Sequence, residues 1–99
     1  MGRRDDITVS AYVVRSMDKF IVTPEKVVHE RAKGVRGAVI VAAYAVAVRG
    51  GKQIGNVVML RDELKKKLPG CMKIAAFINA AKAVVMSRLT RRVLAGQVK

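Results

Sequence analysis

Cysteine and acidic residues are scarce in this sequence. A single cysteine, Cys71, excludes an internal disulfide and a metal cluster held by several thiolates, and it favours a reducing compartment. Aspartate and glutamate total 7 against 20 Lys and Arg, which gives a formal net charge of +13. Such an excess favours a polyanionic partner, and nucleic acid is the first candidate.

Long apolar runs are also missing. The longest, AVIVAAYAVAV at residues 38–48, is far shorter than the ~20 residues that a membrane-spanning helix needs. Near the N-terminus, Arg3 and Arg4 lead directly to Asp5 and Asp6, without the apolar stretch of a secretory signal. We therefore expect a cytoplasmic protein without a membrane partner, associated with the nucleoid or with a ribonucleoprotein.

No convergent set of catalytic or metal-binding residues stands out. Asp62 and Glu63 are sequence neighbours, and adjacent residues on a helix do not converge as a general acid and base must. The lone histidine, His29, falls on a predicted helix surface without a catalytic or metal partner. We expect no enzyme activity and no catalytic residue, metal, cofactor or small-molecule substrate.

The sequence is nevertheless rich in apolar residues, which make up 52% of it. This content separates it from disordered basic tails, which lack the apolar surface to offset ordering entropy. Its 99 residues predict one nucleic-acid-binding domain over residues 1–99. The aromatic residues stand in apolar settings and are expected in the core, which argues against stacking of single-stranded bases. They are Tyr12, Phe20, Tyr44 and Phe77.

Local patterns predict an α+β fold. Residues 7–14 and 38–48 are rich in β-branched side chains, and a strand is predicted over each. A helix is predicted from Pro24 to about residue 33, because Thr23 can cap its first turn. A second helix is predicted over 54–68, where apolar residues recur at spacings of three and four. The order βαβα predicts a small two-layer core.

The C-terminal segment, residues 72–95, is open to two interpretations. Its apolar residues recur at spacings of three and four and it is rich in alanine, which favours a helix over a β-hairpin. A mostly α-helical hairpin is the alternative fold for the chain as a whole.

The first candidate nucleic-acid-binding site is the glycine turn in RGGKQIGN, residues 49–56. It presents Arg49, Lys52 and Gln53 just before the predicted helix, whose N-terminal N–H groups and dipole favour an anion. The segment lacks the Gly-Lys-Ser/Thr of a P-loop, which disfavours a nucleotide site. A basic turn that only joins two buried elements is the equally weighted alternative.

The second candidate site is SRLTRR, residues 87–92. Arg88, Arg91 and Arg92 are three and four residues apart, so they can share one helical face and neutralise successive phosphates. The lysines at 65–67 are attributed instead to the end of their helix, where the dipole favours cations without any ligand.

The stretch AVAVRGGKQIGNVVMLRDELKKKLPG, residues 45–70, resembles the strand, glycine turn and second helix of the Alba family of small basic DNA- and RNA-binding proteins. The likeness lies in Gly51 and Ile54, spaced Gly-x-x-Ile, followed by Val57-Val58 and the basic helix end. It implies a βαβαββ fold with a C-terminal β-hairpin and a homodimer. It also implies nucleic-acid contacts from the glycine turn.

Two functions follow as hypotheses. The first is a sequence-tolerant DNA- or RNA-binding protein of chromatin or ribonucleoprotein type, a homodimer or higher oligomer whose Lys and Arg replace counterions along phosphates. The alternative is a structural subunit of a ribosomal or virion nucleoprotein assembly, in which residues 38–48 and the C-terminal segment pack against neighbours. Phosphate contacts do not distinguish DNA from RNA.

Overall fold

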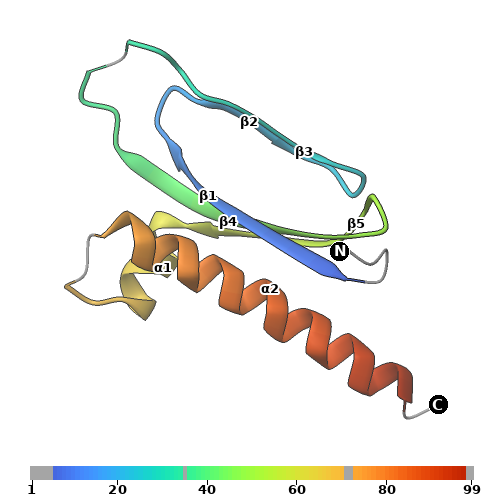
Figure 1. Ribbon diagram of the computed structural model, residues 1–99. Helices are drawn as coiled ribbons and strands as arrows, with labels where there is room; N and C mark the ends of the chain where they lie inside the picture. Colours follow the sequence, from blue (N-terminus) through green and yellow to red (C-terminus); the bar gives the residue numbers. More distant parts are fainter. Residues whose placement is uncertain (1–5, 35, 71–72, 98–99) are drawn as a thin grey trace.

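A three-stranded antiparallel sheet forms the middle of the molecule (Figure 1). The computed structural model describes residues 6–34, 36–70 and 73–97. Strands β1 (Ile7–Arg15), β4 (Ile40–Arg49) and β5 (Lys52–Leu60) pair in the order β1-β4-β5, with β4 in the centre. The strands predicted over 7–14 and 38–48 are therefore confirmed, with small differences at their ends.

The other elements lie on the two faces of this sheet. Strands β2 (Lys19–Val22) and β3 (Val27–Glu30) form a separate hairpin over one face, and helix α2 (Ile74–Gln97) crosses the other beside the short helix α1 (Arg61–Lys67) (Figure 1). The α+β class and the helical interpretation of the C-terminal segment are confirmed. Three layers take the place of the expected two, and five strands precede both helices, so neither the βαβα order nor the α-helical hairpin is found.

Small side chains let α2 approach the sheet closely. Ala43, Ala45 and Ala47, on the central strand, are 0% exposed. A Cβ added at Gly55 of β5 would lie 3.4 Å from Leu89 Cδ2 of α2. The helix contributes larger residues that fill this layer, since native interiors leave few voids. These are Phe77, Val85 and Leu89, and Ala81 is buried among them.

A second, smaller cluster lies between the sheet and the hairpin. Val14, Ala42 and Tyr44 are buried there, and Phe20 and Val27 of the hairpin pack against them. Residues 42–48 of the apolar run are thus buried or half-buried between α2 and the hairpin, whereas Val39 and Val41 are 48% and 39% exposed. The hydrophobicity of residues 42–48 therefore does not by itself require a neighbouring subunit.

Residues 24–33, predicted as a helix, form a turn and strand β3, so this prediction is wrong. Thr23 accepts a hydrogen bond from the Lys26 amide at its Oγ1, at 3.1 Å, and its own amide donates to the Lys26 carbonyl at 2.9 Å. Val22 and Val27 face each other across this turn. Thr, Pro and an acidic residue start a β-turn as readily as a helix, and pairing between the β-branched flanks decides the outcome.

The helix predicted over 54–68 is also wrong in its first half. Residues 52–60 form β5, and only residues 61–67 are helical. Val57 and Met59 point into the layer under α2 with 4% and 3% exposure, the alternation of a strand. Tertiary contact overrides the helical spacing here. Cys71, Arg3 and Arg4 lie outside the described residues.

Candidate functional site

The glycine turn closes a β-hairpin between β4 and β5. Gly50 and Gly51 have φ angles of 58° and 77°, and Arg49 faces Lys52 across the turn. Positive φ at both central residues is the requirement of a type I′ turn, the tight connection that suits the twist of antiparallel strands. The turn therefore leads into a strand, so the predicted anion site at a helix N-terminus is wrong.

Arg49 and Lys52 are a cross-strand pair at the tip of this hairpin. Directly opposite residues place their Cβ atoms about 5 Å apart, where like charges repel. Both side chains are exposed. An anion bound between them would relieve the repulsion. The turn therefore presents the two positive charges that the sequence predicted, but without the helix dipole.

Gln53, the third predicted residue of the turn, is engaged within the chain. Its side-chain Nε2 donates to the carbonyls of Thr23 and Pro24, at 3.4 and 3.1 Å. These bonds tie the tip of the β2–β3 hairpin to β5. The amide group thus positions the hairpin, and its two donors are occupied.

Arg92 comes from the second predicted site and contacts the first. Its Nη1 donates to the Ile54 carbonyl at 2.8 Å. The ladder shifts register at this point, pairing Ala47 with Gly55 and Val48 with Gln53, so Ile54 is the extra residue of a β-bulge. Arg92 and Gln53 line one shallow hollow of about 270 Å³ together with Pro24, Ile54, Gly55 and Asn56.

Arg88 and Arg91 lie in a different groove, between α1 and α2. This groove has a volume of about 300 Å³, and Lys67 of α1 lines it with the two arginines. Sequence spacing predicts the arginine pair, but it attributes Lys67 to the helix end alone. Only the packing of α1 beside α2 brings the lysine to the arginines, so no local signal in the sequence could have found this neighbour.

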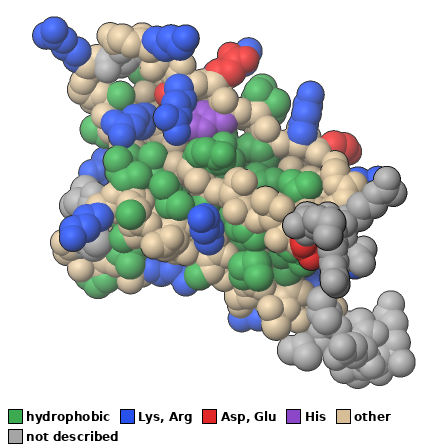
Figure 2. Space-filling model, viewed as in Figure 1, with side chains coloured by type: hydrophobic (Ala, Val, Ile, Leu, Met, Phe, Trp, Pro, Cys, Tyr) green, Lys and Arg blue, Asp and Glu red, His purple; other side chains and the backbone are tan. Residues whose placement is uncertain are grey.

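Few basic side chains are paired in the part of the chain from residue 7 onward that the structure describes. The ion pair found there joins Asp18 and His29, and no Lys or Arg side chain of residues 7–34, 36–70 and 73–92 pairs with a carboxylate of those residues. Figure 2 shows Lys and Arg side chains at many points around one face, with few Asp or Glu. Apart from Arg92, which donates to the Ile54 carbonyl, these basic side chains are available to an external anion.

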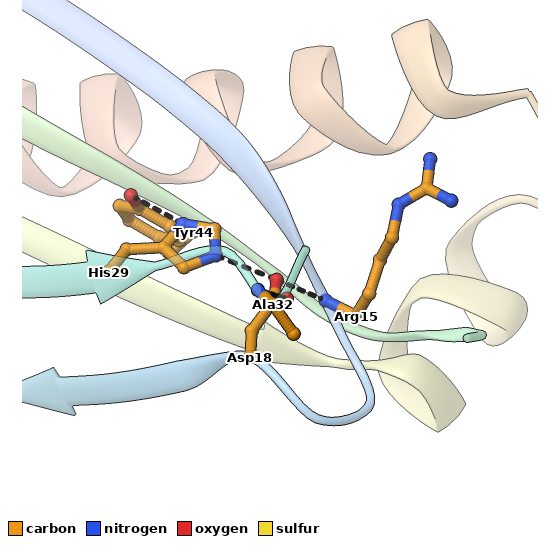
Figure 3. Close-up of polar contacts among 5 residues, drawn as sticks. All are labelled: Arg15, Asp18, His29, Ala32 and Tyr44. Atoms are coloured by element: carbon orange, nitrogen blue, oxygen red, sulfur yellow. Dashed lines mark hydrogen bonds and ion pairs between the residues drawn. The ribbon is translucent and has the colours of Figure 1, made fainter. Parts of the chain in front are cut away.

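A polar cluster that sequence analysis missed ties the hairpin to the sheet (Figure 3). His29 donates from Nε2 to Asp18 Oδ2 at 2.9 Å, and its Nδ1 lies 3.1 Å from the Tyr44 hydroxyl. Asp18 also accepts hydrogen bonds from the amides of Arg15 and Ala32, both at 3.0 Å. The side chains of His29 and Asp18 are only 6% and 5% exposed.

The prediction of an exposed histidine on a helix is thus wrong. His29 lies on β3 opposite Phe20, whose ring meets the imidazole edge-on at 5.7 Å between centroids. The strand register brings Asp18 and Tyr44 to the imidazole, although they lie 11 and 15 residues away in sequence. The predicted helix over residues 24–33 would have placed the His29 side chain in solvent, which is why its partners were not predicted.

The pKa shifts in the cluster favour the protonation states that its hydrogen bonds need. Hydrogen bonds from His29 and from the Arg15 and Ala32 amides hold the pKa of Asp18 well below its usual range. Burial raises the pKa of the Tyr44 hydroxyl, with a further contribution from Tyr12 and an opposing one from Arg31. At neutral pH the carboxylate is ionised and the phenol keeps its proton, so Asp18 accepts from an Nε2–H of His29.

In the described ranges, no group of three His, Cys, Asp or Glu side chains is placed to hold a metal ion. Neither described helix is long and apolar enough to cross a membrane. Comparison with known proteins finds no matching family model, no matching curated protein and no matching solved structure.

Proposed function

We propose that the protein is a sequence-tolerant nucleic-acid-binding protein whose Lys and Arg side chains contact the phosphate backbone. The observation that carries this proposal is the exposed pair of Arg49 and Lys52, which face each other at the tip of the β4–β5 hairpin. Holding two like charges together costs stability, and a phosphate between them offsets that cost.

The groove between the two helices supports the same function. Arg88, Arg91 and Lys67 line it, and none of them forms an ion pair with a carboxylate of the described residues. Arginine binds phosphate in a bidentate manner, and lysine acts as a point charge beside it. With a net charge of +13, a chain of this kind is expected to bind DNA or RNA at many sequences.

This function does not depend on membership of the Alba family. The resemblance covers residues 45–70, where the turn connects two strands and only residues 61–67 are helical. The proposal implies a chromatin- or ribonucleoprotein-type role in the cytoplasm and requires no catalytic group or cofactor.

The test is the salt dependence of binding to duplex nucleic acid. Each neutralised phosphate adds roughly 0.9 to the slope of log affinity against log salt on duplex DNA. We expect a steep slope and similar affinities for unrelated sequences. A slope near zero, or no binding at low salt, would reject the proposal.

A structural subunit of a nucleoprotein assembly is the second candidate, and one observation favours it. Strand β1 is an edge strand of the described sheet and carries no charged residue from Ile7 to Val14. Unpaired edges are templates for pairing with another chain, and charged side chains usually block them. Self-association through β1 would give a homodimer or a higher oligomer.

Hydrodynamic size after nuclease treatment separates these two candidates. A monomer or a discrete dimer that still binds duplex favours the first function. An ordered polymer that persists without nucleic acid favours the assembly subunit.

A further inference from the structure

Tyr12 differs from the other three aromatic residues, because it is not part of the core. Phe77 and Tyr44 are 2% and 6% exposed and Phe20 is half-buried, whereas Tyr12 is 43% exposed. The Tyr12 ring packs against Tyr44 with centroids 5.6 Å apart and an interplanar angle of 34°. Tyr44 thus supports the ring from the sheet, and part of its surface stays open to solvent.

Hollows lie on both sides of this ring. One, of about 330 Å³, lies under the hairpin tip, where Ser10, Glu25, Lys26 and Gly51 also line it. The other, of about 510 Å³, lies beside the end of β1, where Asp18 and Arg31 are among its lining residues. The Asp18 carboxylate there already accepts hydrogen bonds from within the chain. Tyr12 lines both hollows, with Lys26 beside Glu25 in one wall and Arg31 in the other.

We propose that Tyr12 is a stacking platform for a base of single-stranded nucleic acid, with the flanking phosphates contacting Arg31 on one side and Lys26 on the other. An aromatic ring between cations suits a strand whose bases are unpaired, because every base has a face that can stack while its phosphates need positive charge. The subsite rests on the proposed function and narrows its ligand to single strands at this position.

The charge around the ring argues against other occupants. An apolar peptide or a lipid chain would place no negative charge near Arg31 and Lys26. A paired base in a duplex is stacked between its neighbours and does not offer its face. A single-stranded segment supplies both groups at once.

The first experiment compares an oligodeoxythymidine with an abasic oligonucleotide of equal length, which keeps the phosphates and lacks the bases. We expect the parent protein to prefer the base-bearing strand. Tyr12→Leu should weaken binding to that strand by roughly 5- to 150-fold, the range seen when a stacking aromatic is removed. It should leave binding to the abasic strand and to duplex DNA unchanged, and Tyr12→Phe should bind like the parent.

A second measurement does not depend on how well Tyr12→Leu folds. The sequence has no tryptophan, so Tyr12→Trp introduces a single fluorescent reporter at the platform. The matched control is Met86→Trp on α2, because Met86 is 44% exposed, as Tyr12 is 43% exposed. We expect the base-bearing strand to quench the fluorescence of the reporter at position 12, and the abasic strand to quench neither reporter.

Different experimental results would overturn the stacking platform and the proposed function. Equal affinity for base-bearing and abasic strands, with a steep salt dependence, would overturn the platform and leave phosphate binding intact. Quenching of the reporter at position 86 equal to that at position 12 would overturn it too. Absence of binding to any of these nucleic acids would reject both.

Discussion

Arg92 of α2 donates from Nη1 to the carbonyl of Ile54, the bulged residue of β5, at 2.8 Å. The guanidinium therefore supports the fold at a point where the ladder leaves a backbone group without a strand partner. Arg91, one residue earlier, lines the groove with Arg88 and Lys67. Two neighbouring arginines thus have separable roles.

Arg92→Ala is expected to lower the free energy of unfolding by about 1 kcal/mol, the net value of a typical hydrogen bond, because the Ile54 carbonyl loses its partner. Arg91→Ala is the matched control and should leave stability unchanged while weakening binding to duplex DNA. Urea denaturation of both variants measures the difference. Equal stabilities would show that the Arg92 contact contributes nothing in solution.

Replacing Arg49 and Lys52 together with alanine should weaken binding to all sequences and reduce the salt slope by roughly two phosphates' worth. Stability should stay the same or rise slightly, because the repulsion across the turn is removed. The matched control replaces Lys65 and Lys66, which are exposed on α1 and do not line the helix groove. A larger loss of binding in this control would move the site from the hairpin to α1.

Asp18→Asn is expected to make stability less dependent on pH in acid. The pKa of Asp18 is lowered in the folded state, so its contribution is complete above the unfolded value of about 4 and is lost as the pH falls further. The parent and the variant should thus differ most at neutral pH and converge at low pH. Thermal unfolding from neutral to acid pH tests this, with Asp62→Asn on α1 as the control that should track the parent.

Gly51→Val should destabilise the β4–β5 hairpin by about 1–2 kcal/mol, the cost of a left-handed conformation for a residue with a side chain. This cost comes from the φ of 77° at Gly51 and not from a steric clash, since a Cβ added here would meet no described atom within 4 Å. Gly51→Asn is expected to cost less, since asparagine tolerates this region. Equal melting temperatures for the valine and asparagine variants would argue against a backbone origin.

Met17→Gly should stabilise the protein by about 0.5–1 kcal/mol. The change removes the strain of a positive φ at a residue with a side chain, and part of this gain is lost because glycine has more conformational entropy in the unfolded chain. Met17 has a φ of 80° in the turn between β1 and β2, and its side chain is 74% exposed, so little packing is lost. The same change at Met86, within α2, is expected to destabilise by about 1 kcal/mol. Opposite signs in calorimetry would confirm that the backbone sets both effects.

The sequence predicted elements where a single local pattern dominated. The β-branched run 38–48 and the alanine-rich C-terminal segment became β4 and α2. Sequence-based predictions were wrong where one pattern fits two structures. Thr23-Pro24 suits a helix start and a turn, and the spacing of Ile54, Val57 and Val58 fits a helix as well as a strand with a bulge.

Predictions for the site divided along the same line. The positive charge of the turn and the pairing of Arg88 with Arg91 depend on local spacing, and both segments present these side chains at the surface. The partners of His29, the position of Lys67 and the exposure of Tyr12 depend on strand register and on helix packing. Contacts between residues distant in sequence decide these features, and no window of the sequence contains them.

The strand order β1-β4-β5 also has a consequence for how the chain folds. During synthesis β1 emerges first, but its partner β4 emerges only after the whole β2–β3 segment. Hairpins of nearby strands form within microseconds, whereas pairing of distant strands must first overcome the entropy of closing a loop. Early formation of the β2–β3 hairpin would bring the end of β1 towards the start of β4 and shorten that loop. The β2–β3 hairpin, which holds His29 in the folded protein, would thus also speed the pairing of β1 with β4 during folding.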